Sequence, residues 1–221
     1  MAYLYVTKDD GKSWRCIDYL ARNNVKHVHL VKYSRRFARL VVTDGDKRKQ
    51  SYWLDPMDEM EERNFKEGRF DSFAWGGGHT AFAESHNATL LGTDYTAGTN
   101  SIICLRSSVD SSARMLPSPY RRSPVVNMHS ISNGAGSITF ASLIAPRNNW
   151  SSALIYSDDD GDSWNRLIEF NGRDVNFFIA NAQQGVGHSL VISFSDLKSG
   201  EIRTFIISSQ ATERTETTTL Q

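Results

Sequence analysis

Residues 157–164 read Ser-Asp-Asp-Asp-Gly-Asp-Ser-Trp, and this stretch decides the fold. It lies between an apolar run, 153–156, and an alternating run, 165–170. Two such runs joined by a short acidic segment that contains Gly indicate a β-hairpin. An Asp in the turn can accept hydrogen bonds from nearby backbone N–H groups, Gly can adopt a positive φ, and Trp can fold back over the turn. We therefore predict a rigid hairpin tip.

A second copy of this pattern stands near the start of the chain. Residues 7–14 read Thr-Lys-Asp-Asp-Gly-Lys-Ser-Trp and follow the apolar run 3–6. The copies share Thr7, Asp9, Gly11, Ser13 and Trp14 in the first, and Ser157, Asp159, Gly161, Ser163 and Trp164 in the second. They start 150 positions apart, which divides into three steps of about 50, a period typical of structural repeats. Residues 108–112 keep a Ser and an Asp without the Gly and Trp, and one interpretation is a degenerate third copy.

Composition excludes several classes of protein. The 221 residues carry 25 basic and 25 acidic side chains, so bulk charge does not favour binding to nucleic acid or to an anionic membrane. No apolar run approaches the roughly 18 residues of a membrane-spanning helix. The chain enters a strand pattern at once, without the pattern of a signal peptide, so we expect synthesis in the cytoplasm without secretion by such a peptide. Cys16 and Cys104 lie within β-runs, and we predict two buried free thiols.

The remaining sequence predicts an all-β chain. Short runs rich in Val, Ile, Phe, Tyr and Thr alternate with turns of Gly, Asn, Asp, Ser and Pro. They group in fours at intervals of about 50 residues, which is typical of propeller blades. We predict a single small β-propeller over 1–209, with about four, or alternatively five, four-stranded antiparallel blades and a ring closed by pairing of the N- and C-terminal strands. The predicted repeats lie near 26–70, 79–118, 125–170 and 174–208, with 2–20 in addition.

Two further segments have predictions of their own. Residues 55–63 begin with Asp and Pro and carry acidic residues in the first turn, which predicts a short helix. Residues 210–221 form a polar arm without core residues, which we expect to be disordered alone and able to order against a partner.

Both copies of the turn resemble the Asp-box, or BNR repeat, of sialidases and related β-propellers. The resemblance implies a structural hairpin between the third and fourth strands of a blade, so the shared residues are expected to be fold determinants. The chain departs from catalytic sialidases because it lacks an Arg-Ile-Pro segment and is too short for six blades. No three arginines stand out as a catalytic set. We therefore expect a sialidase-like fold without the sialidase catalytic residues, and an enzyme is the less favoured alternative.

The functional hypothesis follows from that departure. We expect a non-enzymatic structural or interaction module, an adaptor within a phage virion, in its tail or connector region. Its expected partners are other protein subunits, either virion proteins or further copies of itself, without nucleic acid, membrane or cofactor. The alternative is a propeller that binds carbohydrate or processes glycans in the manner of a sialidase.

Other side chains form weaker candidate sites. His27, His29 and His129 lie on predicted first strands, which line the central channel of a propeller, so a histidine-lined channel is one hypothesis. Two basic pairs in loops are candidate contacts to a partner or a sugar acid: Arg35 and Arg36, and Arg121 and Arg122. The acidic turn at 157–164 does not fit a calcium-binding loop, because Tyr156 and Leu167 would occupy carboxylate positions. The sequence therefore predicts no metal site.

Overall fold

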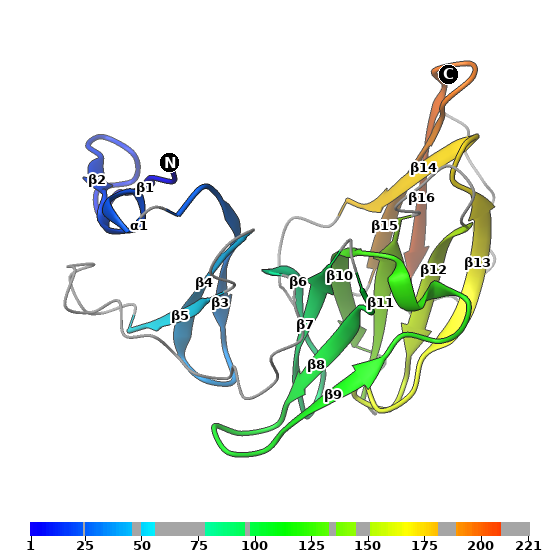
Figure 1. Cartoon of the computed structure of the whole chain (residues 1–221), viewed down its shortest axis with the longest axis horizontal. Coiled ribbons are helices and arrows are strands. Elements are labelled where there is room, and N and C mark those ends of the chain that lie inside the picture. Colours follow the sequence, from blue (N-terminus) through cyan, green and yellow to red (C-terminus); the bar gives the residue numbers. More distant parts are fainter. Residues whose placement is uncertain are drawn as a thin grey trace.

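The computed structural model describes residues 1–23, 25–45, 50–55, 78–95, 98–132, 136–144, 151–180 and 189–208. Their strands form five small antiparallel sheets, so the all-β prediction is confirmed (Figure 1). We name the sheets A to E in chain order. The predicted helix at 55–63 lies outside the described residues apart from Asp55, and so does the predicted arm at 210–221.

Two of the sheets have four strands, and the others have two or three. Sheet A is β1 (Leu4–Val6) and β2 (Arg15–Ile17), and sheet B is β3 (Val28–Ser34), β4 (Arg39–Asp44) and β5 (Ser51–Leu54). Sheet C is β6 (Gly78–Glu84), β7 (Thr89–Asp94), β8 (Ser101–Leu105) and β9 (Ser111–Met115). Sheet D is β10 (Val125–Ser132), β11 (Ser137–Leu143), β12 (Ser151–Ser157) and β13 (Asn165–Asn171). Sheet E is β14 (Val175–Ile179), β15 (Ser189–Asp196) and β16 (Ile202–Ser208). The described helices are α1 (Tyr19–Arg22) and one 3₁₀ turn, η2 (Tyr120–Arg122).

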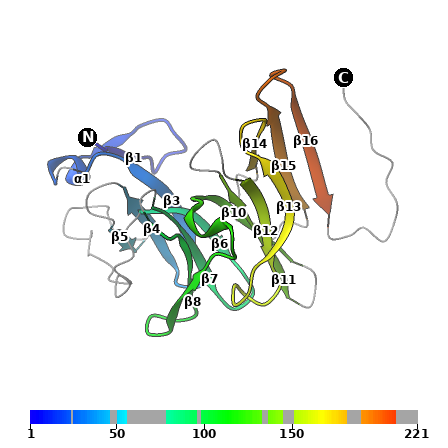
Figure 2. The same ribbon diagram turned by 45° about the vertical axis from the view of Figure 1, so that its right-hand side comes forward.

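The hydrophobic cores lie between consecutive sheets. Leu4, Val6 and Leu20 of the N-terminal segment pack with Val42 and Tyr52 of sheet B. Three further cores join sheet B to C, C to D, and D to E; they include Val41 with Leu91, Leu90 with Ile155, and Leu154 with Ile192. Alternate side chains of a strand point to opposite faces, so one strand contributes to two cores. The sheets therefore form a series in chain order, as Figures 1 and 2 show.

The terminal strands do not pair as the sequence predicted. Among the described strands, β1 and β2 pair with each other, and β16 pairs with β15. The reason is that the N-terminal hairpin is held at the sheet B end of the molecule, far from β16 (Figure 1). Its apolar side packs on sheet B, and the Ala2 N–H donates to the carbonyl of Val25, just before β3, at 2.9 Å. The described sheets thus form an open series, and the predicted closure of the ring is absent from it.

Two local predictions also differ from the structure. The predicted repeat at 2–20 is not strand to its end: β2 stops at Ile17, and one turn of helix at 19–22 places Leu20 and Ala21 in the core. Cys104 is buried as expected, but Cys16 is exposed because it pairs with Tyr5 on the outer side of the hairpin.

Candidate functional site

The two acidic turns are rigid, and their carboxylates are used within the turn. In the second copy, Ser157 Oγ donates to Asp159 Oδ1 at 2.7 Å and accepts from the Gly161 N–H at 2.9 Å. The Ser163 N–H and hydroxyl donate to the two oxygens of Asp159 at 2.9 and 2.6 Å. The Trp164 indole N–H donates to the Gly161 carbonyl at 3.2 Å. Asp159 therefore acts as the centre of a closed hydrogen-bond network.

The first copy repeats this network bond for bond. Asp9 accepts from Thr7 Oγ1 at 2.8 Å, and from the Ser13 N–H and hydroxyl at 2.9 and 2.6 Å. Gly11 has a φ of 88°, matching 89° at Gly161, and its carbonyl accepts from the Trp14 indole at 3.1 Å. The hydrogen bonds from Ser13 and Thr7 lower the pKa of Asp9 to about 2. An aspartate held ionised in this way is a structural acceptor rather than a general acid.

The surroundings of the two turns differ greatly. Trp164 is 8% exposed and belongs to the core between sheets C and D, whereas Trp14 is 60% exposed. The second turn is also bonded to sheet C, because the Asp160 carboxylate accepts from the Asn87 backbone and side-chain amides at 3.1 and 2.8 Å. Asp162 forms ion pairs with Arg106 and Arg114 of the same sheet at 2.8 and 2.7 Å, which lower the pKa of its carboxyl.

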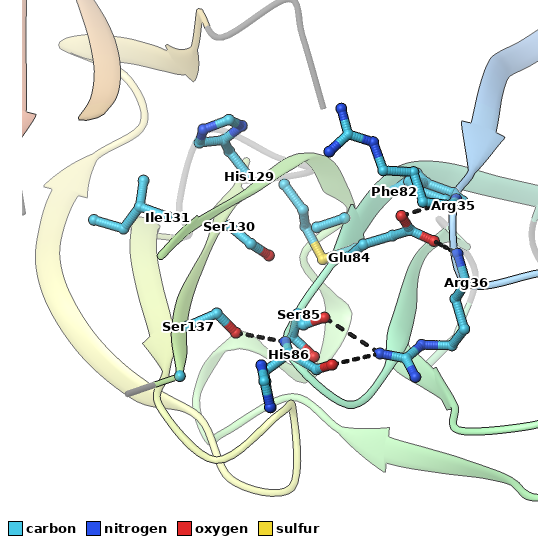
Figure 3. A pocket seen from close by; sticks show the side chains of 13 residues that line it. Arg35, Arg36, Phe82, Glu84, Ser85, His86, His129, Ser130, Ile131 and Ser137 are labelled. Atoms are coloured by element: carbon cyan, nitrogen blue, oxygen red, sulfur yellow. Dashed lines mark hydrogen bonds between the residues drawn. The ribbon is translucent and has the colours of Figure 1, made fainter. Parts of the chain in front are cut away.

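A pocket of about 470 Å³ lies where the ends of sheets B, C and D meet (Figure 3). The β3–β4 turn contributes Arg35 and Arg36, and the β6–β7 turn contributes Ser85 and His86. Strand β10 contributes residues 128–131. The pocket therefore combines segments that lie far apart in the sequence, and it contains one predicted basic pair together with one predicted histidine.

The carboxylate and one arginine of the pocket are fixed by hydrogen bonds. Glu84 accepts from the Ser34 hydroxyl at 2.6 Å and from the backbone N–H groups of Arg35 and Arg36 at 3.0 and 3.2 Å. The Arg36 guanidinium donates to the His86 carbonyl at 2.7 Å. These bonds join the turns of sheets B and C and shape the pocket wall.

Two side chains of the pocket are better placed to meet a ligand. Arg35 is exposed and lines the pocket. The carboxylate of Glu84, which also lines the pocket, already accepts hydrogen bonds from Ser34 and from the backbone. His129 is 5% exposed, and its Nε2 atom is buried without a hydrogen-bond partner among the described residues. Burial and the charge of Lys32 lower the pKa of His129 despite a hydrogen bond with the Ser189 backbone, so the neutral imidazole dominates at pH 7. A cation beside a neutral imidazole can bind a carboxylate or a sugar hydroxyl group.

The structure does not bring the three predicted channel histidines together. His27 and His29 lie near the start of β3, with their Nε2 atoms 2.7 Å apart, and His129 lies in the pocket beyond the other end of that strand. The neighbour of His29 is His79, whose pKa is lowered to about 4 by desolvation and by His29. His79 was outside the predicted set, although its place at the start of a first strand was a usable signal. The described residues contain no group of three or more His, Cys, Asp and Glu side chains suited to a metal ion.

The second basic pair lies apart from the pocket. Arg121 and Arg122 belong to η2, and their carbonyls accept from the backbone and side-chain amides of Asn100 at 2.6 and 3.2 Å. Residues 108–112, which one interpretation takes as a degenerate copy, cover the end of the β8–β9 turn and the start of β9, between the third and fourth strands of sheet C. The second acidic turn has the equivalent position in sheet D, between β12 and β13.

Comparison with known proteins finds no family model that matches the chain and no similar curated protein. The described part of the chain also contains no helix that is both long enough and apolar enough to cross a membrane.

Proposed function

We propose that the protein is a non-enzymatic interaction module of the Asp-box β-propeller type, in which sheets B to E are the blades. Two features support the propeller assignment. The first strands contact one another in sequence, β3 with β6, β6 with β10, and β10 with β14. The second acidic turn joins the third and fourth strands of its sheet, as the resemblance implies.

One observation carries the interaction role: apolar side chains are exposed at both ends of the series of sheets. Tyr3, Tyr5 and Trp14 are exposed on the hairpin at one end, and Phe178 and Ile206 on sheet E at the other. Large apolar side chains exposed on one surface favour binding to other proteins. The internal use of Glu84, Asp9 and Asp159 as hydrogen-bond acceptors also favours a structural role over acid–base chemistry.

The experiment for this proposal pairs an activity assay with a mass measurement. The purified chain should leave a fluorogenic sialoside intact and should form complexes with itself or with a defined subunit in size-exclusion chromatography with light scattering. Hydrolysis that is lost in Arg35→Ala and kept in Arg121→Ala would overturn the non-enzymatic assignment. The virion setting is a prediction from the resemblance, and neighbouring genes for capsid and tail proteins would support it.

A glycan-binding function is the second candidate, favoured by the pocket that holds Arg35 and the buried Nε2 atom of His129. An acidic sugar would place its carboxylate at Arg35 and a hydroxyl group at His129. A glycan array is the direct test. Retention of acidic glycans that Arg35→Ala abolishes and Arg121→Ala leaves unchanged would favour this function, and an array without signal would count against it.

A further inference from the structure

The second acidic turn shows how such a turn binds a neighbouring sheet. Trp164 packs with Leu90, Ile102 and Cys104 of sheet C, and the Cys104 thiol donates to the Asp160 carbonyl at 3.4 Å. The packing is close, because a Cβ added at Gly161 would lie 2.7 Å from Leu90 Cδ2. The face of sheet C that receives this turn is the face directed towards the next sheet of the series.

The equivalent face of sheet E can be identified from strand register. In sheet C, the pair Leu90–Cys104 joins β7 to β8 on the receiving face. In sheet E, the pair Val191–Ile206 joins β15 to β16 on the face that points away from sheet D. The opposite face carries Leu190 and its neighbours, which form the core with sheet D. Ile206 therefore occupies in sheet E the place that Cys104 occupies in sheet C.

This outer face of sheet E carries the apolar side chains of Phe178, Val191, Ile202 and Ile206, with Ser193, Ser195, Thr204 and Asn176 among them. Phe178 is 48% exposed, Ile202 is 67% exposed and Ile206 is 70% exposed. Every residue of β16 is exposed, whereas the third strands β8 and β12 of the complete sheets are largely buried. The outer face of sheet E therefore resembles the face of sheet C that binds residues 157–164, but no acidic turn of the described residues packs on it.

The N-terminal hairpin, at the other end of the series, has an acidic turn whose Trp14 side chain is exposed. This turn has the same internal hydrogen bonds as residues 157–164, but no sheet of the described residues covers Trp14. Leu4 and Val6 pack on sheet B, so the alternate residues Tyr3 and Tyr5 point outwards and are exposed. The hairpin and sheet E lie at opposite ends of the molecule in both views (Figures 1 and 2).

We propose that the outer face of sheet E binds the N-terminal hairpin of a second copy of this chain. Trp14 of one copy packs between Val191 and Ile206 of the other, as Trp164 packs on Leu90 and Cys104 within the chain. Each contact joins the hairpin of one copy to sheet E of another, so the two surfaces are different. Two copies can therefore form a closed pair in which each hairpin binds the partner's sheet E. Alternatively, further copies can add head to tail. The inference rests on the proposed interaction role and names self-association as one form of it.

Sedimentation of the intact chain is the first test. The wild-type chain should associate at tens of micromolar, and either Trp14→Ala or Ile206→Asp should shift it to monomer. Val109→Asp is the matched control, because Val109 is 92% exposed in the β8–β9 turn, away from both surfaces. A mixture of the Trp14→Ala and Ile206→Asp chains should form one-to-one pairs, because each retains the surface that the other lacks. A wild-type chain that sediments as a monomer, or association that both substitutions leave unchanged, would overturn the proposal.

Disulfide trapping separates a second copy from contact within one chain. Asp10→Cys and Ile206→Cys in a Cys16→Ser background reproduce the contact between Asp160 and Cys104. Mild oxidation should give a crosslinked dimer on a non-reducing gel, whereas the control pair Asp10→Cys with Val109→Cys should stay monomeric. An intramolecular crosslink would overturn the proposal in favour of ring closure within the chain. The two proposals can fail separately. Glycosidase activity would count against the proposed non-enzymatic function but would not change the sedimentation or crosslinking results. A monomeric chain would overturn self-association, and the proposed function would then require binding to a different subunit.

Discussion

Trp14 and Trp164 occupy the same turn, but the structure gives them different energetic roles. Each indole N–H donates to the carbonyl of the glycine three residues earlier. Trp164 adds a buried aromatic face between two sheets, and Trp14 leaves that face in solvent. The motif therefore forms its turn through polar bonds, and its contribution to stability depends on whether a sheet receives it.

We predict that Trp164→Ala lowers the free energy of unfolding by roughly 3 kcal/mol, the cost of truncating a buried aromatic side chain. Trp14→Ala should cost about 1 kcal/mol or less, because it removes one hydrogen bond and little burial. Urea denaturation at low protein concentration, where the chain is monomeric, measures both. Equal effects of the two substitutions would contradict this account of the turns.

The carboxylates of the turns predict a loss of stability in acid. The pKa of Asp9 is depressed from 3.8 to about 2 in the folded chain, so the folded state favours the ionised form. Its contribution is fully present above the unfolded pKa and is lost as the pH falls from about 4 towards 2. Burial raises the pKa of Asp159, but hydrogen bonds from Ser163 and Ser157 outweigh burial and lower it.

Denaturation midpoints measured across this pH range provide the test. The wild-type chain should lose stability with acid more steeply than the Asp9→Asn variant, whose side chain does not titrate. Asp158→Asn is the control, because Asp158 is an exposed carboxylate of the second turn. Parallel curves for the wild type and Asp9→Asn would show that the turn does not hold the ionised carboxylate.

At the scale of the element, each hairpin tip depends on its glycine. Both glycines have positive φ, but their surroundings differ: Leu90 crowds Gly161, and the nearest atom to a Cβ at Gly11 is 3.9 Å away in Trp14. We predict that Gly11→Ala costs about 1 kcal/mol for backbone strain alone. Gly161→Ala should cost about 2 kcal/mol or more, because it also displaces Leu90.

Chemical denaturation of the two alanine variants distinguishes these costs. A Gly161→Ala, Leu90→Ala double variant should show non-additive losses, because the smaller side chain relieves the crowding. The same second substitution should add independently to Gly11→Ala. Additivity in both pairs would indicate that Leu90 does not limit the turn.

Some elements of the structure could be predicted from the sequence, and others could not. The acidic turns and the strand-rich pattern followed from local residue types, because hairpin tips and period-two alternation are short-range signals. The turn of helix at 19–22 was missed, since its formation depends on the burial of Leu20 against sheet B. The pocket was missed as a unit because Arg35 and His129 meet only through packing of sheets B, C and D. The sequence paired the C-terminal strands with the N-terminal ones, whereas β16 pairs with β15 among the described strands. A strand pattern does not reveal which strands lie beside it.

At the scale of the whole molecule, stability should vary along the series of sheets. The core between sheets C and D includes Leu90, Ile102, Leu143 and Ile155, whereas β16 is exposed throughout. Amide protons exchange fastest where few apolar contacts cover the hydrogen bonds. We predict slow exchange in β8 and β12 and fast exchange in β2 and β16, measured by mass spectrometry at low protein concentration.

Assembly changes this prediction in a defined way. At concentrations where copies associate, β16 and residues 7–14 should gain protection together, because they contact each other across the copies. Ile206→Asp should abolish the gain, and Val109→Asp should leave it. Protection of β16 alone would point to a different occupant of the outer face.

The arrangement of cores between consecutive sheets also has a consequence for biosynthesis. Each of the four described cores joins a segment to the one that leaves the ribosome directly after it, so none of these four depends on a distant part of the chain. Folding can then follow translation sheet by sheet, since domains and repeat units fold as their own residues become available. Among the described sheets, sheet E leaves the ribosome last. The nascent chain therefore gains the proposed binding face only after sheets A to D have been made.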